Sequence, residues 1–456
     1  MHPRNAYRTP PDLGALAARD AQLRPYVRVH DGHAAVAWDD PAAVRAVTEA
    51  LLREDFGVHV TLHPDRLCPT LPNRLNYVLW IEDVMHALHP VDGVPTHVRG
   101  IDVGTGSVAI YAVLACAKNP GWTVVGTDVD EEALSHARKV LEDDANNAVA
   151  AGSERRLRER IQLVHTRGAL LGELVPPAGD ATPHTHPRYH FTMCNPPFYA
   201  SPEERQASTD AKKAARAWAE GHPHELYTPG GEAGFVLQLL EESLVTREQI
   251  VYVPRSPSWY TTMLGKLASV HTLIHALRRA QITNYATTEL VQGQTKRWAV
   301  AWSFRGSRLP DAVARGVPAV APPSTERVLR AARLVDVDGA PCTLRAFLAS
   351  LTSLPENAVA MRGADEHLAL DLYSACWTRG ARRKRARHEH DAAEGATRGA
   401  CPRPVLAVDV ARDAGALRVR WTYGMERVLF ESFAVHLFGE VGRRLSSTAC
   451  GARAHR

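Results

Sequence analysis

Apolar residues recur at helical spacing in the first part of the chain. Val44, Val47 and Leu51 lie about one turn apart, and they follow Asp40, a residue type that caps helix starts. Gly57 belongs to the residue type that most often ends helices. The pattern predicts an amphipathic helix between Asp40 and Gly57.

The hydrophobic pattern changes near residue 98. A second helical stretch at 75–88 ends before Pro90, and short β-prone runs then alternate with helical segments. Strands separated by helices are typical of parallel sheets with both faces covered. We therefore predict a doubly wound α/β domain over 96–304, preceded by basic and helical residues at 1–95. The expected strands lie at 97–104, 122–129, 161–165, 190–195, 249–254 and 297–304.

The regular alternation ends at residue 304. Residues 305–330 are rich in Pro, Arg and Ala and are expected to form a linker. A small accessory α+β domain is expected over 331–446, interrupted by a disordered basic insert at 379–403. Its last helix would bury one apolar stripe, made of Met425, Leu429, Phe433, Leu437 and Val441.

The composition is that of a globular protein with more than one domain. The chain has 456 residues, 45% of them hydrophobic and 23% charged, whereas one core usually serves roughly 250 to 300 residues. We expect a soluble, non-secreted protein, because no apolar run reaches the roughly 20 residues of a membrane span and the N-terminus lacks a signal-peptide core. The seven cysteines are scattered without a CxxC pair, which favours reduced thiols over disulfides or a zinc site.

Basic residues gather in two places, although the net charge is only +4. The first thirty residues carry several arginines, and the segment RGARRKRARHEH at 379–390 is denser still. A solvated charged surface remains one interpretation of each. The second cluster is more typical of a nuclear-localisation signal or a nucleic-acid contact. The arginines of the first cluster are Arg4, Arg8, Arg19, Arg24 and Arg28.

The stretch GIDVGTGSVAI at 100–110 has the pattern of a nucleotide-binding turn. An apolar strand ends at Asp102, and Gly104 and Gly106 allow a tight turn that a ligand can approach closely. A second strand ends at Asp128, a position from which a carboxylate can bind ribose hydroxyls. An NAD enzyme would satisfy both features, and a Rossmann-like core without a ligand is a further alternative.

The stretch CNPPFYA distinguishes among these alternatives, because it ends a strand at the edge where such sheets bind ligands. The side-chain oxygen of Asn195 and the carbonyl of Pro196 can each accept one N–H bond from an exocyclic amine. Pro197 makes the carbonyl placement rigid. Phe198, with Tyr199 as a second candidate, would stack on a base turned out of its strand. The alternative is that Asn-Pro-Pro forms only a turn.

The chain resembles the methyltransferase-like protein 16 family, the U6 small nuclear RNA N6-adenosine methyltransferases, which are related to bacterial enzymes that modify an adenosine in large-subunit ribosomal RNA. The resemblance covers roughly residues 1–304. The matching segments are MHPRNAY, AVRAVTEALLREDFG, PTLPNRLNYVLWIED, RGIDVGTG, TDVD, CNPPFY, GGEAGFV, WYTTMLGK and QGQTKRWAVAWSF.

The resemblance implies S-adenosylmethionine as the cofactor and a seven-stranded class I fold, with residues 195–198 as a catalytic clamp around adenine. Asp102, Gly104 and Gly106 would belong to the cofactor site, as would Arg74 in PNRLNY. Two positions depart from the family pattern. Asp128 replaces a glutamate at the ribose position. Ala169 stands where relatives often have threonine, so only a backbone contact survives in a loop (166–173) that is regulatory in some relatives.

The resemblance also implies RNA as the partner, most specifically U6 small nuclear RNA, and a nuclear location. The phosphate-contacting residues would be Arg4, Arg8, Lys266, Lys296 and Arg297. Tyr199 would contact the RNA as well, and residues 200–229 would form a mobile loop over the flipped base. We expect a monomer without a bound metal.

Two other functions remain open at this point. A guanine-N2 or protein-glutamine methyltransferase uses the same Asn-Pro-Pro clamp and does not need the basic N-terminal arm. A non-catalytic RNA-binding splicing factor is the alternative from a different class. The presence of both Asn195 and Asp128 counts against it, since a pure binder could lose both residues freely.

Overall fold

The computed structural model divides the chain into two compact units. Unit 1 comprises 1–304 and 315–322, and unit 2 comprises 305–314 and 323–456. The residues that the structure describes are 1–30, 33–88, 97–147, 156–171, 174, 189–211, 221–246, 259–330, 333–381, 383, 403–413 and 415–454.

Unit 1 carries most of the helices and the strands that were expected to form the α/β domain. Its helices are α1 (Leu13–Arg19), α2 (Pro41–Phe56), α3 (Leu71–Leu88), α4 (Ile110–Lys118), α5 (Glu131–Glu142), α6 (Leu157–Arg160), α7 (Pro202–Ala211), α8 (Pro223–Leu226), α9 (Gly231–Thr246) and α10 (Leu267–Arg279). Its strands are β1 (Val27–His30), β2 (His33–Val36), β3 (Val98–Val103), β4 (Trp122–Asp128), β5 (Ile161–His165), β6 (Phe191–Cys194), β7 (Tyr260–Leu264), β8 (Tyr285–Gln292) and β9 (Thr295–Trp302).

The helix expected after Asp40 is confirmed as α2. The Asp40 carboxylate accepts a hydrogen bond from the Ala42 amide at 2.9 Å, and Gly57 adopts a left-handed φ of 63° at the helix end. α3 begins at Leu71, four residues before the expected start. It is buried around most of its circumference, so its sequence carries little of the polar and apolar alternation that marks a helix at the surface.

The central strands form two sheets joined by one bridge. A four-stranded parallel sheet has the order β5-β4-β3-β6, and a three-stranded antiparallel sheet has the order β7-β9-β8. Phe191 in β6 and Trp259 beside β7 make the bridge between them. The α/β architecture is as expected, whereas the single seven-stranded sheet is represented here by these two bridged sheets. The strand expected at 249–254 lies outside the described residues.

The strand order places a topological switch point between β3 and β6. The chain leaves β3 for β4 on one side, while β6 pairs with β3 on the other, with Val103 opposite Cys194. In open α/β sheets, ligands bind beyond the carboxyl ends of the strands at such a point. Because the register is parallel, the residues that directly follow these two strands, Gly104 and Asn195, meet at the same edge.

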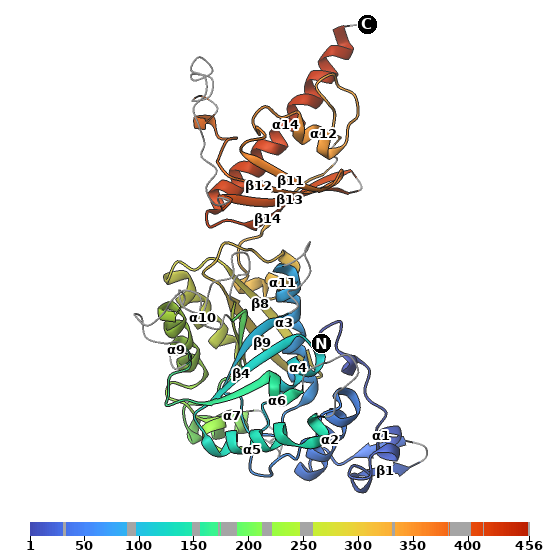
Figure 1. The fold of residues 1–456 in the computed structure, drawn as a ribbon, viewed down its shortest axis with the longest axis vertical. Coiled ribbons are helices and arrows are strands. Elements are labelled where there is room, and N and C mark those ends of the chain that lie inside the picture. The colour runs from blue at the N-terminus through green and yellow to red at the C-terminus, as the bar shows by residue number, and fades with distance from the viewer. Residues whose placement is uncertain are drawn as a thin grey trace. The chain divides into compact units, whose positions relative to one another are not determined.

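Helices cover both sides of these strands. Figure 1 shows α9 and α10 on one side and α3 and α4 on the other. The core beneath α9 and α10 contains Leu240, Leu273 and Leu277, which pack with Ile101 of β3. Because helices cover the faces of the sheet, the polar side chains lie on the turns at the carboxyl ends of β3, β4 and β6.

Unit 2 is an antiparallel sheet with helices. Its strands are β10 (Glu326–Leu329), β11 (Val359–Ala364), β12 (His367–Leu372), β13 (Leu406–Asp413) and β14 (Ala416–Tyr423), in the order β10-β14-β13-β12-β11, and its helices are α11 (Asp311–Ala314), α12 (Leu344–Ala349) and α14 (Arg427–Ala454). Phe433, Leu437 and Val441 of α14 are buried in its core, as the apolar stripe predicted. Met425 instead precedes the helix and is 62% exposed.

The stretch expected as a linker is structured. Residues 305–330 contain α11, the short helix at Pro318–Val320 and strand β10. Val317 and Val320 are buried in the core of unit 1, whereas β10 pairs with β14 in unit 2. Proline and arginine content suggested a linker, but the prolines flank short helices here. Most of the basic insert at 379–403 lies outside the described residues.

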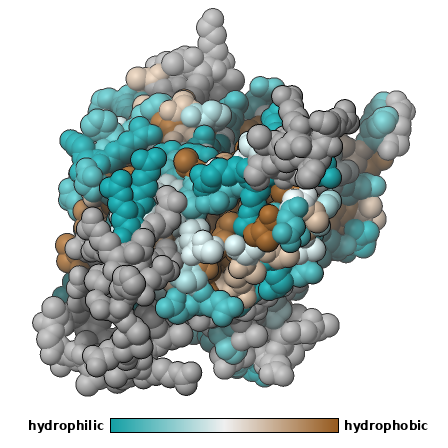
Figure 2. Space-filling model, turned by 90° about the horizontal axis from the view of Figure 1, so that it is seen from above, coloured by the Kyte–Doolittle hydropathy of each residue, from teal (hydrophilic) through white to brown (hydrophobic). Residues whose placement is uncertain are grey.

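One face of the molecule is largely polar where its residues are described. Figure 2 shows one face of the molecule, on which hydrophilic residues occupy broad areas and hydrophobic residues form smaller patches. In the described part of the chain, no helix is long and apolar enough to cross a membrane, and no group of three or more His, Cys, Asp or Glu side chains could hold a metal ion. The cysteines that the structure describes form no disulfide: Cys68, Cys116, Cys194, Cys342 and Cys376.

Replacing Gly100 in β3 with alanine should destabilise unit 1. A Cβ atom there would lie 2.4 Å from the outer end of the Phe191 ring, at its Cζ atom. Overpacking of this kind costs about 1 to 3 kcal/mol, so thermal denaturation should show a lower Tm. Phe191→Leu in the Gly100→Ala background should recover part of the loss. A double variant no more stable than expected from the two single changes would contradict this steric explanation.

Candidate active site

A pocket opens at the carboxyl ends of β3, β4 and β6, at the switch point. Its walls come from the turns after these strands, from the start of α3, and from residues 66–69 and 224–225. Six of the residues predicted from the sequence line this pocket: Arg74, Gly104, Gly106, Asp128, Asn195 and Pro197.

The glycine turn after β3 forms the floor of the pocket. Gly104 and Gly106 have φ values of 70° and 71°, and no atom would lie within 4 Å of a Cβ built at either position. The turn is held by Asp128, whose carboxylate accepts a hydrogen bond from the Gly106 amide at 2.8 Å. Left-handed φ favours glycine at both positions, and the open space above them allows a ligand to approach the backbone.

Asp102 lies beneath this turn rather than in the pocket wall. Its side chain is fully buried, and one carboxylate oxygen accepts a hydrogen bond from the Thr105 hydroxyl at 2.7 Å. The other oxygen has no partner among the described residues. Burial raises the pKa of Asp102 to about 7, a shift that the Thr105 hydrogen bond opposes and nearby Asp128 adds to. The structure therefore places Asp102 as a support of the turn.

Asn195 follows β6 and faces the pocket with an unused acceptor. Its side-chain oxygen is buried and has no hydrogen-bond partner among the described residues. The strand end before it is fixed, because Tyr77 of α3 accepts a hydrogen bond from the Cys194 amide at 3.3 Å. Leaving a buried acceptor unpaired costs free energy, so this oxygen is suited to a ligand N–H.

The aromatic pair after the two prolines lies at the edge of the site. The Phe198 ring packs against Gly265, where a Cβ atom would lie 2.8 Å away from it. The Arg297 guanidinium lies 5.3 Å from the centroid of the same ring. Tyr199 pairs with Tyr227 in a parallel bridge. Neither aromatic residue nor Pro196 is part of the pocket wall described above, which fits a role beside the cofactor rather than around it.

Arg74 and Ala169 differ in their relation to the pocket. Arg74 lines it, with its guanidinium 5.4 Å from the Tyr111 ring centroid and its Nε atom buried without a partner among the described residues. Ala169 does not line it, whereas its neighbour Leu170 does. The Leu170 amide donates to Glu242 of α9 at 2.9 Å. Two residues of the loop expected at 166–173, 172 and 173, lie outside the described part.

The N-terminal basic residues are packed onto the protein rather than extended from it. Arg4 pairs with Glu82 at 2.7 Å and with Asp83 at 2.5 Å, both on α3. Arg8 is exposed and donates to the carbonyl of Pro3 at 3.3 Å. The expected basic arm is thus held against α3 at Arg4. The two carboxylates that pair with Arg4 would compete with RNA phosphates for its charge.

The other basic candidates point in different directions. Lys296 is exposed and pairs with Glu289 at 2.8 Å. Arg297, the next residue in β9, faces the site, and burial together with the nearby Arg74 lowers its pKa. Neighbouring residues of a strand project to opposite faces, so this pair cannot contact one phosphate row together. Lys266 donates to the carbonyl of Phe198 at 3.0 Å.

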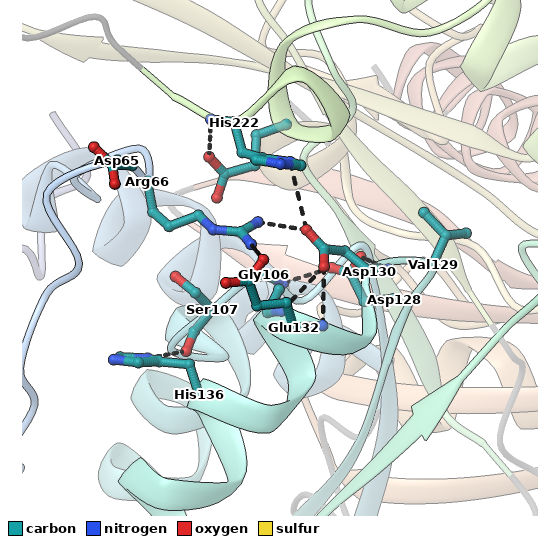
Figure 3. A network of polar contacts seen from close by, with 12 residues as sticks. Asp65, Arg66, Gly106, Ser107, Asp128, Val129, Asp130, Glu132, His136 and His222 are labelled. Atoms are coloured by element: carbon teal, nitrogen blue, oxygen red, sulfur yellow. Dashed lines mark hydrogen bonds and ion pairs between the residues drawn. The ribbon is translucent and has the colours of Figure 1, made fainter.

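A network that the sequence analysis missed closes the rim of the pocket. Arg66, whose side chain is only 7% exposed, pairs with Asp130 at 2.5 Å, and Asp130 caps α5 through the Glu132 amide. Figure 3 shows Arg66, Asp130 and His222 turned toward one another at the start of α5. Glu225 of α8 accepts from the Leu67 amide at 3.0 Å. Capping patterns such as DEEAL could have indicated Asp130, but Arg66 and Glu225 carry no local signal.

The loop expected at 200–229 is partly helical. It contains α7 and α8, with 212–220 outside the described residues. The bridge at Tyr227 and the Glu225 bond to residue 67 attach its second half to the clamp and to the pocket rim. The described half therefore forms a wall of the site.

The residues present fit a nucleoside-containing cofactor. The glycine turn leaves room against the backbone, Asp128 stands at the pocket edge with a carboxylate, and buried polar atoms of Arg74 and Asn195 lack partners among the described residues. Ribose hydroxyls could donate to Asp128, a ligand carboxylate could accept from Arg74, and an amine could donate to the Asn195 oxygen.

Comparison with known proteins agrees with this geometry. A family model described as RNA methyltransferase matches residues 1–306. The chain belongs to this family. Its members among curated proteins include the RNA N(6)-adenosine-methyltransferase mettl16 of Danio rerio, which is 34% identical over 338 residues. The match covers 73% of this chain and 63% of that relative. The human METTL16 protein is also 34% identical, over 67% of this chain and 50% of its own length.

Shorter family members are covered almost completely. The U6 small nuclear RNA (adenine-(43)-N(6))-methyltransferase of Drosophila pseudoobscura pseudoobscura is 33% identical, with 68% of this chain and 94% of that protein covered. The chain thus spans only about half to two thirds of the vertebrate relatives named above. The sequence resemblance to the methyltransferase-like protein 16 family is confirmed.

Two solved family structures align with the chain. The hMettl16 catalytic domain in complex with the MAT2A 3'UTR hairpin 1 has a TM-score of 0.55 and 33% identity, and the alignment covers 71% of this chain and 98% of that one. The N-terminal domain of human METTL16 in complex with SAH has a TM-score of 0.51 and 33% identity, over 67% of this chain and 98% of that one. These similarities support the α/β methyltransferase fold of unit 1.

Replacing Asp102 with asparagine should change how stability depends on pH. The folded-state pKa of about 7 lies above the ordinary value of 3.8, so wild-type stability is lost as the pH rises from about 4 through about 7. Asparagine does not ionise. The Tm of the variant relative to wild type should therefore rise between about pH 4 and about pH 7 and then level off. Asp65→Asn, at an exposed carboxylate, is the matched control, and parallel pH profiles for Asp102→Asn and wild type would refute the shift.

Proposed function

We propose that the chain transfers a methyl group from S-adenosylmethionine to N6 of an adenosine in RNA. The observation that carries this proposal is the buried side-chain oxygen of Asn195, which has no hydrogen-bond partner in the described part of the chain and lies in the same pocket wall as the glycine turn. A pocket for a nucleoside cofactor and an acceptor for an amine thus meet at one switch point. The family membership and the SAH complex of a relative support the choice of cofactor.

The cofactor would supply an electrophilic methyl carbon. The chain's own residues would position the two reactants. Gly104 and Gly106 would leave room for the cofactor along the backbone, Asp128 would accept hydrogen bonds from ribose hydroxyls, and Arg74 would attract its carboxylate. Asp128 already accepts from the Gly106 amide, so the same carboxylate would join the turn to the ribose.

On the acceptor side, the clamp residues would orient the adenine. The Asn195 oxygen and the Pro196 carbonyl would accept the two N–H bonds of the amine, which aims its lone pair. Phe198 would stack on the base, a contact worth about 1 to 3 kcal/mol. No strong base is required before transfer, because the amine proton becomes acidic once the methyl group has arrived. Positioning therefore supplies most of the rate.

We propose U6 small nuclear RNA as the principal substrate, acting in the nucleus, and an adenosine in an unpaired stretch of a hairpin as the target. The names of relatives and the hairpin complex of the human domain support this substrate class. A base must leave its stack to reach such a pocket. The enzyme would act as a monomer without a metal. Guanine-N2 or protein-glutamine methylation and a non-catalytic splicing factor are less well supported by these relatives.

We also propose finer assignments for the fold. The two sheets of unit 1 would act as one seven-stranded class I sheet in the order β5-β4-β3-β6-β7-β9-β8, supported by the bridge between Phe191 and Trp259. Unit 2 would be an accessory RNA-binding domain. Arg362 and Arg418 on its strands pair with Asp371 and Glu326, yet their side chains remain 56% and 52% exposed, and this exposure supports an electrostatic contact.

Replacing Asn195 with alanine should abolish most methylation while RNA binding persists. The change removes one of two acceptors that fix the amine, and misplacement of a reacting group can cost about 10²-fold in rate. Tritium transfer from labelled cofactor to a short U6-like hairpin measures the rate, and nuclease digestion identifies the labelled nucleoside as N6-methyladenosine.

Asn357→Ala, at an exposed position of unit 2, serves as the control and should keep wild-type activity. Label found in guanine or in a protein substrate would reject the proposed reaction, and so would full activity of Asn195→Ala.

A further inference from the structure

We propose that Lys266 is a positioning residue for the base-stacking side of the clamp, and that it acts by holding the main chain of Phe198. The inference rests on the proposed function and adds a residue to its machinery. The sequence had suggested a phosphate contact for this lysine, and its surroundings point elsewhere.

The ammonium group of Lys266 contacts both the clamp and α7, although the side chain is 38% exposed. Its Nζ atom donates to the Phe198 carbonyl at 3.0 Å and to the Glu204 carboxylate at 2.5 Å. It also lies 5.3 Å from the centroid of the Tyr199 ring. Since the Glu204 charge and an aromatic face already satisfy it, the group is poorly placed to attract an RNA phosphate.

The main chain of Lys266 is fixed by a second acid. Glu232, in the first turn of α9, is 1% exposed and accepts hydrogen bonds from the amides of Gly265 and Lys266, the latter at 3.1 Å. A lysine side chain is flexible, so its end can position another group only when its base is held. Glu232 supplies that restraint directly after β7.

Glu204 extends the same arrangement to the start of α7. Its carboxylate accepts from the Ala200 amide at 2.7 Å as well as from Lys266. Hydrogen bonding to Ala200 and pairing with Lys266 both lower the pKa of Glu204. The segment between Phe198 and Ala200 is therefore tied to α7 and to the end of β7 through one lysine and one carboxylate.

The ring of Phe198 and its carbonyl are fixed from the same place. The ring packs against Gly265, where a Cβ atom would lie only 2.8 Å from it. The side chain of Lys266, the residue after Gly265, donates a hydrogen bond to the Phe198 carbonyl. The stacking face would thus stand ready before the base arrives. Such preorganisation lowers the barrier of the transfer step without adding a contact to the RNA backbone.

The test uses the full-length protein with Lys266→Met, Lys266→Arg and Gly265→Ala. Steady-state methylation at saturating cofactor gives kcat and the KM for RNA, and fluorescence anisotropy gives the RNA Kd at several salt concentrations. Methionine keeps the length of the side chain without its charge. Gly265→Ala keeps the lysine side chain and displaces the ring, and its Cβ would also lie 3.1 Å from the Glu232 carboxylate that holds the main chain here.

We expect Lys266→Met to lower kcat by about 10- to 100-fold, as a small misplacement of reacting groups does, while KM, Kd and salt slope stay within about twofold of wild type. Gly265→Ala should give the same kcat loss, and Lys266→Arg should restore part of the activity. Lys139→Met, at an exposed lysine on α5, should match wild type. Circular dichroism and Tm confirm that each variant is folded, and a 2-aminopurine at the target position reports the stacking independently, with weaker quenching in Lys266→Met.

A higher Kd and shallower salt slope with unchanged kcat would identify Lys266 as a phosphate contact and overturn the inference. Equal kcat loss in Lys139→Met would also overturn it. If wild type labels guanine or protein while the RNA adenosine stays unlabelled, the proposed function is rejected. That result comes from wild type alone, so it is distinguished from a failure of the Lys266 inference, which the comparison of variants tests.

Discussion

The parallel pairing of β3 with β6 is the constraint on which the site depends. With Val103 opposite Cys194, the residues that follow these strands emerge side by side from a fully covered sheet. A shift of the pairing by one residue would turn the strand's side chains to the other face. The glycine turn and Asn195 would then no longer open into one pocket. Tyr77, which holds the Cys194 amide from α3, helps to keep this register.

Local sequence predicted the parts of the site that depend on the backbone. Gly104 and Gly106 adopt left-handed φ, which few other residues tolerate, and Asn195 directly follows a short buried strand and precedes two prolines. Such positions carry their conformation in the residue type, so a single sequence reveals them. Asp102 was harder to place, because whether a strand-end carboxylate faces a pocket or lies beneath a turn depends on packing.

Residue type says less about the partner of a charge. Arg4 and Lys266 looked like phosphate contacts because they are basic residues in a predicted RNA-binding protein. In the fold, both side chains form ion pairs with acidic residues that are distant in sequence. Arg4 pairs with Glu82 and Asp83, and Lys266 pairs with Glu204. Arg66 was missed for the same reason, since its partner Asp130 follows sixty-four residues later. Charge pairs across elements require the tertiary structure.

The path of the chain between the two units has a further consequence. It leaves unit 1 after residue 304, returns for 315–322, and leaves again. A single cleavage therefore cannot yield both units whole. A break at 304 deprives unit 1 of Val317 and Val320. A break at 323 separates α11 from the rest of unit 2, where the Thr325 amide donates to Asp311. The two units thus alternate along the chain, so gene rearrangements that add or remove unit 2 at one junction would damage one of the two folds.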